Sequence, residues 1–359
     1  MRRDRPTLAL MLGIPVIQLM VFGYAIRMDV RHLPMTVYDE SRTLQSRELV
    51  QKLVATDNFR LARPAPSYDE AIRMIGRGEA RAAIVIPEDY ARLLKRGRPA
   101  TAQLLVDATD PNTSQNAIAA AQLVGQRQNV MLLASRVGAS AHDVTPPFEI
   151  RVRPLYNPAL KSSIFIVPGI IGMILSITML IITSMSIVRE REFGTMEQLI
   201  VTPVTRGELM LGKISPYVLV GYVQVTAVLL LGRLIFGMPI EGSLLLVYAI
   251  TFPFIVANLG LGLFISTLAR TQAQAMQASY FFVLPNVLLS GFMFPREGMP
   301  PLAREIGLAF PLTYYIQVLR GVLLKGAGFL DVLPQTGMLL GLALVFFGFS
   351  VRRFRKQLE

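Results

Sequence analysis

Few residues of this chain have the side chains on which catalysis or metal binding usually depends. The sequence has 359 residues, no Cys and only two His, which excludes thiolate metal sites, thiol nucleophiles and disulfides. His142 precedes Asp143, but no nucleophile stands in a suitable context, and nothing in the pattern around His32 assigns it a role. We therefore expect no catalytic residue, no metal site and no cofactor.

One stretch fits part of a nucleotide-binding motif. Gly207 to Lys213 matches G-x-x-x-x-G-K, but Ile214 stands where a P-loop needs a Ser or Thr to bind Mg²⁺. The stretch also follows a helical turn that ends at a proline, and a P-loop follows a buried strand. We therefore expect that the chain does not itself bind ATP.

The segment from Arg189 to Val204 has the pattern of a short amphipathic helix that ends at Pro203. Its apolar residues recur at helical spacing, with charged and polar residues on the other faces: Phe193, Met196, Leu199 and Ile200. Such a helix can rest on a membrane surface or present an apolar ridge to a cytoplasmic partner. The pattern alone favours the membrane surface.

Long uncharged runs decide the fold class. A helix needs about 20 apolar residues to cross a bilayer, because its backbone must satisfy its own hydrogen bonds there. Six runs without Asp, Glu, Lys or Arg have this length: 7–26, 162–188, 214–232, 242–269, 271–295 and 332–351. The sequence therefore predicts an α-helical integral membrane protein with six transmembrane helices. The first run can also be interpreted as a signal peptide, but its length favours a span.

A more polar region separates the first two runs. Residues 28–160 carry 17 Lys or Arg and 14 Asp or Glu, as expected for an inserted domain of ordinary size. Short apolar stretches typical of strands are Met35–Tyr38, Phe59–Leu61, Ala82–Ile86, Gln103–Val106 and Glu149–Val152. Helical stretches lie between them, near 41–55, 67–77, 87–96 and 111–137. An α/β domain is therefore expected between residues 1–27, which hold the first span, and residues 161–359, which hold the other five.

The distribution of positive charge predicts the orientation. Twelve Lys and Arg residues lie in the termini and loops on one side of the six-span map, and five lie in the short segments opposite. The side richer in Lys and Arg is cytoplasmic. Both termini are then cytoplasmic and the α/β domain is extracytoplasmic. The net charge of +12 is explained by this bias, and no nucleic-acid partner is needed.

Four segments, in their order along the chain, resemble bacterial ABC-2 type transporter permeases, the membrane subunits of ATP-driven exporters. They are Val167-Pro168-Gly169-Ile170, Arg189 to Val204, Leu289 to Pro295, and Pro311 to Tyr315 with Leu319-Arg320-Gly321. The large domain after the first span is similar to that of the drug-efflux subgroup. The chain departs from the family at its start, where only Met1 to Pro6 precede the first run and a membrane-surface helix is usual.

The resemblance implies roles for particular residues. A coupling helix near 190–203 would dock on an ATP-binding subunit through Glu192, Phe193, Gly194, Thr195, Met196, Glu197 and Leu199. Spans two and five would line the route between two permeases, with the candidate path residues Met173, Thr178, Asn286 and Ser290. Segment 296–325 would be a re-entrant hairpin that closes the exit, marked by Pro295, Pro311, Tyr314 and Tyr315. An ordinary external loop is the alternative for this segment.

The resemblance also implies partners and a function. The expected assembly in the bacterial inner membrane has two ATP-binding subunits and two permeases, identical or sibling, with lipid around them and possible contact with a periplasmic adaptor. It would export a drug or another lipophilic molecule. The alternative is a membrane-anchored sensor or assembly protein whose external domain binds a ligand.

Overall fold

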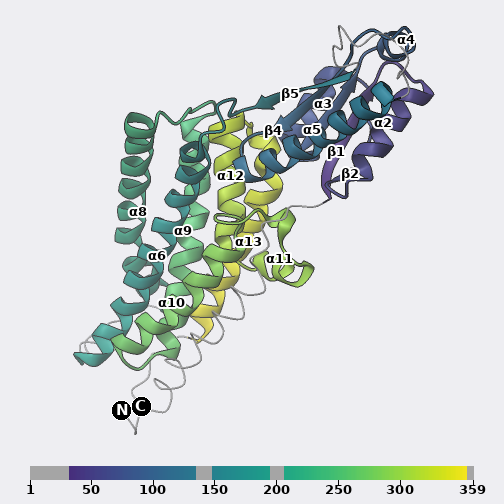
Figure 1. Cartoon of the computed structure of the whole chain (residues 1–359). Helices are drawn as coiled ribbons and strands as arrows, with labels where there is room; N and C mark the ends of the chain where they lie inside the picture. Colours follow the sequence, from purple (N-terminus) through teal and green to yellow (C-terminus); the bar gives the residue numbers. More distant parts are fainter. Residues whose placement is uncertain (1–31, 135–147, 195–205, 354–359) are drawn as a thin grey trace. The chain divides into compact units, whose positions relative to one another are not determined.

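The computed structural model describes residues 32–134, 148–194 and 206–353, and the chain divides into two compact units (Figure 1). One unit holds the described residues up to Phe165, and the other holds those from Ile166 onward. The predicted first span, 7–26, lies outside the described residues.

The first unit is built on a mixed five-stranded sheet. Its strands are β1 Leu33–Asp39, β2 Phe59–Leu61, β3 Ala82–Ile86, β4 Ala100–Asp107 and β5 Phe148–Leu155. Their order is β2-β1-β3-β4-β5, and only the β3–β4 pair is antiparallel. Each strand contains the stretch that its β-branched and apolar residues predict, while the order is new information from the structure.

Helices cover both faces of this sheet. They are α2 Leu44–Val54, α3 Tyr68–Arg77, α4 Tyr90–Lys95 and α5 Pro111–Ala134. Along β3, Ala82, Ile84 and Ile86 pack with residues of α2, α4 and α5, whereas Ala83 packs with residues of α3. The alternation of side chains along a strand therefore builds two apolar layers from one strand.

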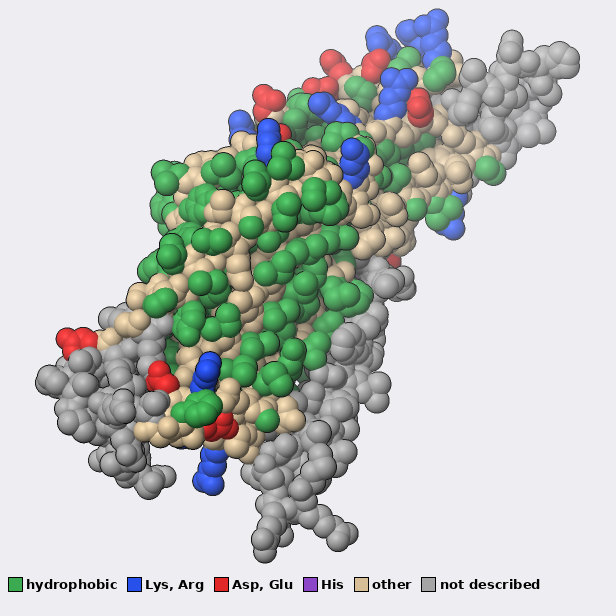
Figure 2. Space-filling view, turned by 90° about the vertical axis from the view of Figure 1, so that its left-hand side faces the viewer, with side chains coloured by type: hydrophobic (Ala, Val, Ile, Leu, Met, Phe, Trp, Pro, Cys, Tyr) green, Lys and Arg blue, Asp and Glu red, His purple; other side chains and the backbone are tan. Residues whose placement is uncertain are grey.

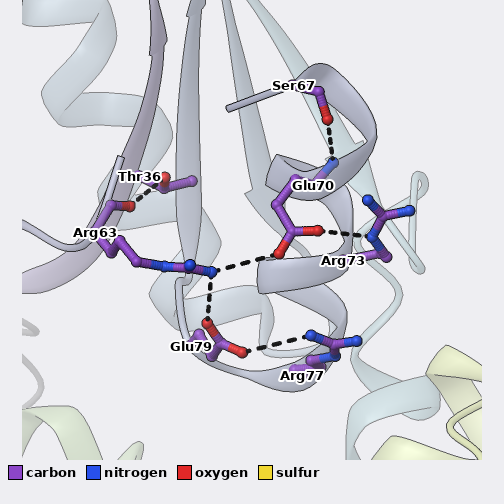
Figure 3. A network of polar contacts seen from close by, with 7 residues as sticks. All are labelled: Thr36, Arg63, Ser67, Glu70, Arg73, Arg77 and Glu79. Atoms are coloured by element: carbon purple, nitrogen blue, oxygen red, sulfur yellow. Dashed lines mark hydrogen bonds and ion pairs between the residues drawn. The ribbon is translucent and has the colours of Figure 1, made fainter. Parts of the chain in front are cut away.

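An ionic network fixes the start of α3 (Figure 3). Ser67 caps the helix by accepting a hydrogen bond from the Glu70 backbone N–H at 3.2 Å. The Glu70 carboxylate accepts from Arg73 Nε at 2.8 Å and lies 3.4 Å from Arg63 Nη2. The hydrogen bond from Arg73 is the main reason why the pKa of Glu70 lies below its ordinary value. Glu79 adds longer contacts, at 3.8 Å to Arg63 and 3.9 Å to Arg77.

A buried ion pair lies at the end of β4. Asp107 is 2% exposed and accepts a hydrogen bond from Arg81 Nη1 at 2.8 Å. It also accepts from the backbone N–H and the hydroxyl of Thr109, at 3.2 and 2.7 Å. A buried carboxylate with these partners is stable only while they remain, because its own desolvation is costly.

The second unit is a bundle of long apolar helices. They are α6 Ser162–Glu192, α8 Arg206–Phe236, α9 Leu244–Leu268, α10 Gln272–Leu289 and α13 Phe329–Arg353. The remaining elements are η1 Arg296–Gly298, α11 Pro301–Gly307 and α12 Pro311–Lys325. Most of the apolar length of α8 and α13 is exposed, whereas α6 and α9 are more than half buried. Figure 2 shows the broad hydrophobic face that results.

Among the described residues, four helices are long and apolar enough to cross a membrane: α6, Ile214–Phe236 of α8, α9, and Phe329–Ser350 of α13. The bent pair α11–α12 is a fifth candidate if it is one broken span. The predicted run 271–295 forms the 18-residue helix α10, which is not among these four. It contains Gln272, Gln274 and Gln277 and is about 27 Å long, slightly shorter than the roughly 30 Å hydrocarbon core.

We predict that residues 28–165 fold alone and that Asp107→Asn destabilises this fragment by about 2 kcal/mol, because Arg81 and Thr109 lose a charged hydrogen-bond acceptor. Chemical denaturation of the purified fragment measures the loss. The control is Glu149→Gln, which removes an exposed pair with Arg151 and should cost about 0.5 kcal/mol or less. Equal losses for the two variants, or the lack of a cooperative transition, would contradict the prediction.

Candidate functional site

The predicted coupling segment begins where α6 ends. Gly194 has φ 70°, the left-handed conformation that commonly ends a helix. The preceding Phe193 is 69% exposed, and the Arg189 guanidinium lies 5.8 Å from the centre of its ring. An exposed aromatic side chain at a helix end can serve as a contact for a partner. The other predicted coupling residues lie outside the described residues: Thr195, Met196, Glu197 and Leu199.

Glu192 joins the end of α6 to the start of α10. Its carboxylate accepts hydrogen bonds from the Gln272 backbone N–H, at 2.9 Å, and from the Gln272 side-chain amide. A carboxylate is favourable there because the first N–H groups of a helix lack intrahelical partners and the dipole attracts negative charge. Nearby, Arg191 Nη1 donates to the Ala269 carbonyl at 3.3 Å. Two side chains of α6 thus hold the turn between α9 and α10.

The candidate path residues divide into two groups. Asn286 and Ser290 are 3% and 1% exposed. Asn286 faces α6 of the same chain, with its Nδ2 3.5 Å from Ser176 Oγ. Met173 and Thr178, on α6, are half-buried. The structure therefore brings Asn286 to α6, and the four residues remain candidates for the path.

The predicted exit hairpin is a sharply bent pair of helices. Pro295 is the N-cap of η1, and Pro311 begins α12, where its lack of an N–H costs nothing. Helices α11 and α12 meet at 85°. The Tyr314 hydroxyl donates to the Leu308 carbonyl at 2.9 Å, which ties the bend to the first turn of α12.

Tyr315 anchors α12 to α9. Its ring stacks on Phe254 with the centroids 3.9 Å apart and the planes 8° apart. Its hydroxyl lies 2.8 Å from Thr251 Oγ1, and both residues are fully buried. Stacking supplies apolar contact, and the hydroxyl pair satisfies two polar groups that would otherwise be costly in this interior.

Close backbone approach fixes the hairpin on α10. A Cβ added to Gly307 would lie 2.6 Å from the Leu289 carbonyl oxygen, so only glycine fits this contact without a shift. The Gly307 carbonyl also accepts from the hydroxyl of Thr313. Glycine at 307 therefore lets α11 lie directly against the end of α10.

Comparison with known proteins identifies the family of this chain. The model of the family described as "ABC-2 family transporter protein" matches residues 5–352. The chain belongs to the ABC-2 family. It is 30% identical to the probable multidrug ABC transporter permease YbhS of Escherichia coli, over 99% of this chain and 94% of that protein. It is 32% identical to YbhR of the same organism, over 92% and 88%.

A more distant relative is the linearmycin resistance permease protein LnrN of Bacillus subtilis, 25% identical over 47% of this chain and 44% of that protein. The family match over residues 5–352 confirms the ABC-2 resemblance of the sequence motifs across almost the whole chain. The protein is an ABC transporter permease, a membrane subunit of the transporter.

The sequence did not predict the contact between Glu192 and Gln272, nor the close approach of Gly307 to the Leu289 carbonyl. Thr271 is the N-cap of α10 and accepts from the Gln274 N–H at 3.2 Å, and this Thr in front of an apolar run was a readable start signal. It does not reveal which residue of another helix lies against that start. Such pairings depend on how helices pack, which spacing within one helix does not determine.

We predict that Gly307→Ala lowers the melting temperature of the detergent-purified permease, because the new Cβ would overlap the Leu289 carbonyl. Overpacking of this kind costs about 1–3 kcal/mol. The matched control is Gly337→Ala in α13, where nothing lies within 4 Å of an added Cβ. The control should keep or slightly raise the melting temperature, because alanine is the better helix former. If both variants melt alike, α11 does not lie against α10 as described.

Proposed function

We propose that this ABC-2 permease exports a drug or another lipophilic molecule, with ATP hydrolysed by a separate subunit that docks on the segment beginning at Glu192. The substrate class is proposed from the relatives YbhS and YbhR, which are named as probable multidrug transporter permeases, and LnrN, which is named as a linearmycin resistance permease. The docking site is supported by one observation above all, the exposed Phe193 at the end of a helix whose apolar length is more than half buried. Glu192, Gly194 and the segment that follows complete this site.

The proposed assembly contains two permeases, identical or sibling, and two ATP-binding subunits. The apolar faces of α8 and α13 suit contact with lipid. Asn286 and Ser290 on α10, with Met173 and Thr178 on α6, remain the candidates for the route, and the bent pair α11–α12 is the candidate exit hairpin. The external domain is the candidate contact for a periplasmic adaptor.

The proposed topology has six spans in the bacterial inner membrane, with both termini cytoplasmic and the α/β domain outside. It rests on the twelve-to-five distribution of Lys and Arg. The four apolar helices and the bent pair are compatible with it. A cytoplasmic location of the turn between α9 and α10 would put Arg270 on the same side as Glu192.

The topology predicts which residues can be labelled from outside. Because the chain has no natural Cys, single cysteines can be placed at two exposed positions, Lys95→Cys in the α/β domain and Arg270→Cys in the turn before α10. A membrane-impermeant maleimide should label the first in intact cells. It should label the second only after the membrane is permeabilised. Labelling of Arg270→Cys in intact cells, or protection of Lys95→Cys, would overturn the map.

The coupling site predicts a loss of the ATP-binding subunit. Phe193→Ala with Met196→Ala should weaken its binding about thirtyfold, because truncating a buried interface anchor commonly costs about 2 kcal/mol. Copurification of the subunit with the tagged permease, and efflux of a lipophilic dye from cells, measure the effect. The permease itself should still be inserted in the membrane, since Phe193 follows the last residue of α6 and Met196 lies outside the apolar runs.

A matched control truncates two exposed apolar side chains at the other end of the bundle. Leu244→Ala with Leu245→Ala removes residues that are 43% and 80% exposed at the start of α9, and it should leave the subunit bound. Wild-type copurification and efflux in the Phe193/Met196 variant would reject the coupling assignment. They would instead favour a helix that only rests on the membrane.

A further inference from the structure

Polar residues of α6 pair with polar residues of α10. On α6, Ser176, Ser184 and Glu192 are eight residues apart, and on α10, Gln272, Ser279 and Asn286 are seven apart. An α-helix turns by about 100° per residue, so the α10 set stays within about 40° of one line along its helix, whereas the α6 set winds through about 160°. We call these six residues the polar seam.

The three residues of α6 pair with the three residues of α10 in antiparallel order. Glu192 accepts two hydrogen bonds from Gln272, the hydroxyl oxygens of Ser184 and Ser279 are 2.8 Å apart, and Asn286 Nδ2 lies 3.5 Å from Ser176 Oγ. Between the first two pairs, Val188, Ala269 and Ala275 form a small buried apolar cluster. The contacts thus extend from the coupling end of α6 towards the opposite end of the bundle.

Four of the six seam residues are buried, and their burial makes separation of the two helices costly. Ser176, Ser184 and Ser279 are fully buried and Asn286 is 3% exposed. A polar group that loses its partner in an apolar interior, without water to replace it, pays its desolvation cost in full. Sliding one helix by a residue, about 1.5 Å, would lengthen all three contacts. The seam therefore resists both separation and sliding.

The end of this helix pair away from Glu192 meets the hairpin. A Cβ added to Gly169 would lie 2.0 Å from the Phe292 ring, and one added to Gly172 would lie 2.5 Å from Leu312. Arg320 Nη1, from α12, donates to the Gly291 carbonyl at 3.0 Å. Gly169 and Glu192 are 23 residues apart on one helix, about 35 Å. A continuous set of contacts therefore joins the coupling end to the hairpin.

We propose that α6 and α10 move as one body, and that the polar seam transmits movement of the coupling segment to the hairpin formed by α11 and α12. Glu192 is a positioning residue in this device, since it fastens the start of α10 to the helix that carries the coupling segment. The inference rests on the proposed function, because it takes that segment as the docking site of the ATP-binding subunit.

A cross-link tests whether the two helices stay together. Ser184→Cys with Ser279→Cys replaces two hydroxyls that are already close, in a chain without other cysteines, and a disulfide needs sulfur atoms about 2.05 Å apart. Iodine should form this bond equally well in the nucleotide-free and the vanadate-trapped complex. The oxidised complex should keep its vanadate-sensitive ATPase activity, with the two single-cysteine variants as controls.

Three results of the cross-linking experiment would overturn the proposal: no bond in either state, a bond whose yield depends on the nucleotide state, or a bond that stops ATP hydrolysis while the complex stays assembled. Each of them would mean that α6 and α10 are not one body through the transport cycle.

A charge swap tests the positioning role of Glu192. The readout is the labelling rate of Leu302→Cys, an exposed position in α11, which should differ between the nucleotide-free and vanadate-trapped states. Gln272→Glu sets two carboxylates against each other at an exposed position and should reduce this difference about threefold, as the loss of an exposed charged pair would. Adding Glu192→Gln restores a carboxylate–amide pair and should restore the difference.

The control for the swap is Glu241→Gln, which removes an exposed carboxylate before α9 and should change nothing. Failure of the double variant to recover, or an unchanged difference in Gln272→Glu, would overturn the role of Glu192. Copurification of the ATP-binding subunit is measured in every sample. If it stays bound while the labelling predictions fail, only the seam is rejected, whereas its absence from the wild-type preparation rejects the proposed function and this inference with it.

Discussion

A bilayer offers no water to polar side chains, and several buried hydroxyl groups in the helical unit of this permease are paired between helices. Ser184 meets Ser279, and the Tyr315 hydroxyl meets Thr251. Each of these pairs joins two different helices, so satisfying the polar groups also fixes which helices are neighbours. The position of the end of α6 at Glu192 relative to the hairpin depends on these pairs together with close packing at small residues.

Small residues make the second contribution to the helical unit. A Cβ on Gly262 of α9 would lie 2.8 Å from the Leu180 carbonyl oxygen of α6. On another side of α9, Ser350 of α13 donates to the Gly260 carbonyl at 2.7 Å. Helix α9 is therefore the central helix on which α6, α12 and α13 pack closely. The outward faces of α8 and α13 are left apolar and exposed, which suits lipid contact.

The sequence was sufficient to predict where the strands and most helices lie along the chain, but not which of them are neighbours in space. Short apolar stretches located all five strands, because their signal is local. The order of the strands, and the antiparallel pairing of β3 with β4, depend on contacts between distant segments. In the same way Phe193 could be proposed as a partner contact from helical spacing. The proximity of Glu192 to Gln272 could not, since nothing in either segment refers to the other.

The central claim is that the segment beginning at Glu192 contacts an ATP-binding subunit. Photo-cross-linking from position 193 in living cells tests it most directly, with benzoylphenylalanine in place of Phe193 and, as a control, in place of Leu219, which is 68% exposed on α8. The account predicts a cross-link from position 193 to a nucleotide-binding protein and none from position 219. Equal cross-linking from the two positions, or a product at 193 that contains no nucleotide-binding protein, would contradict it.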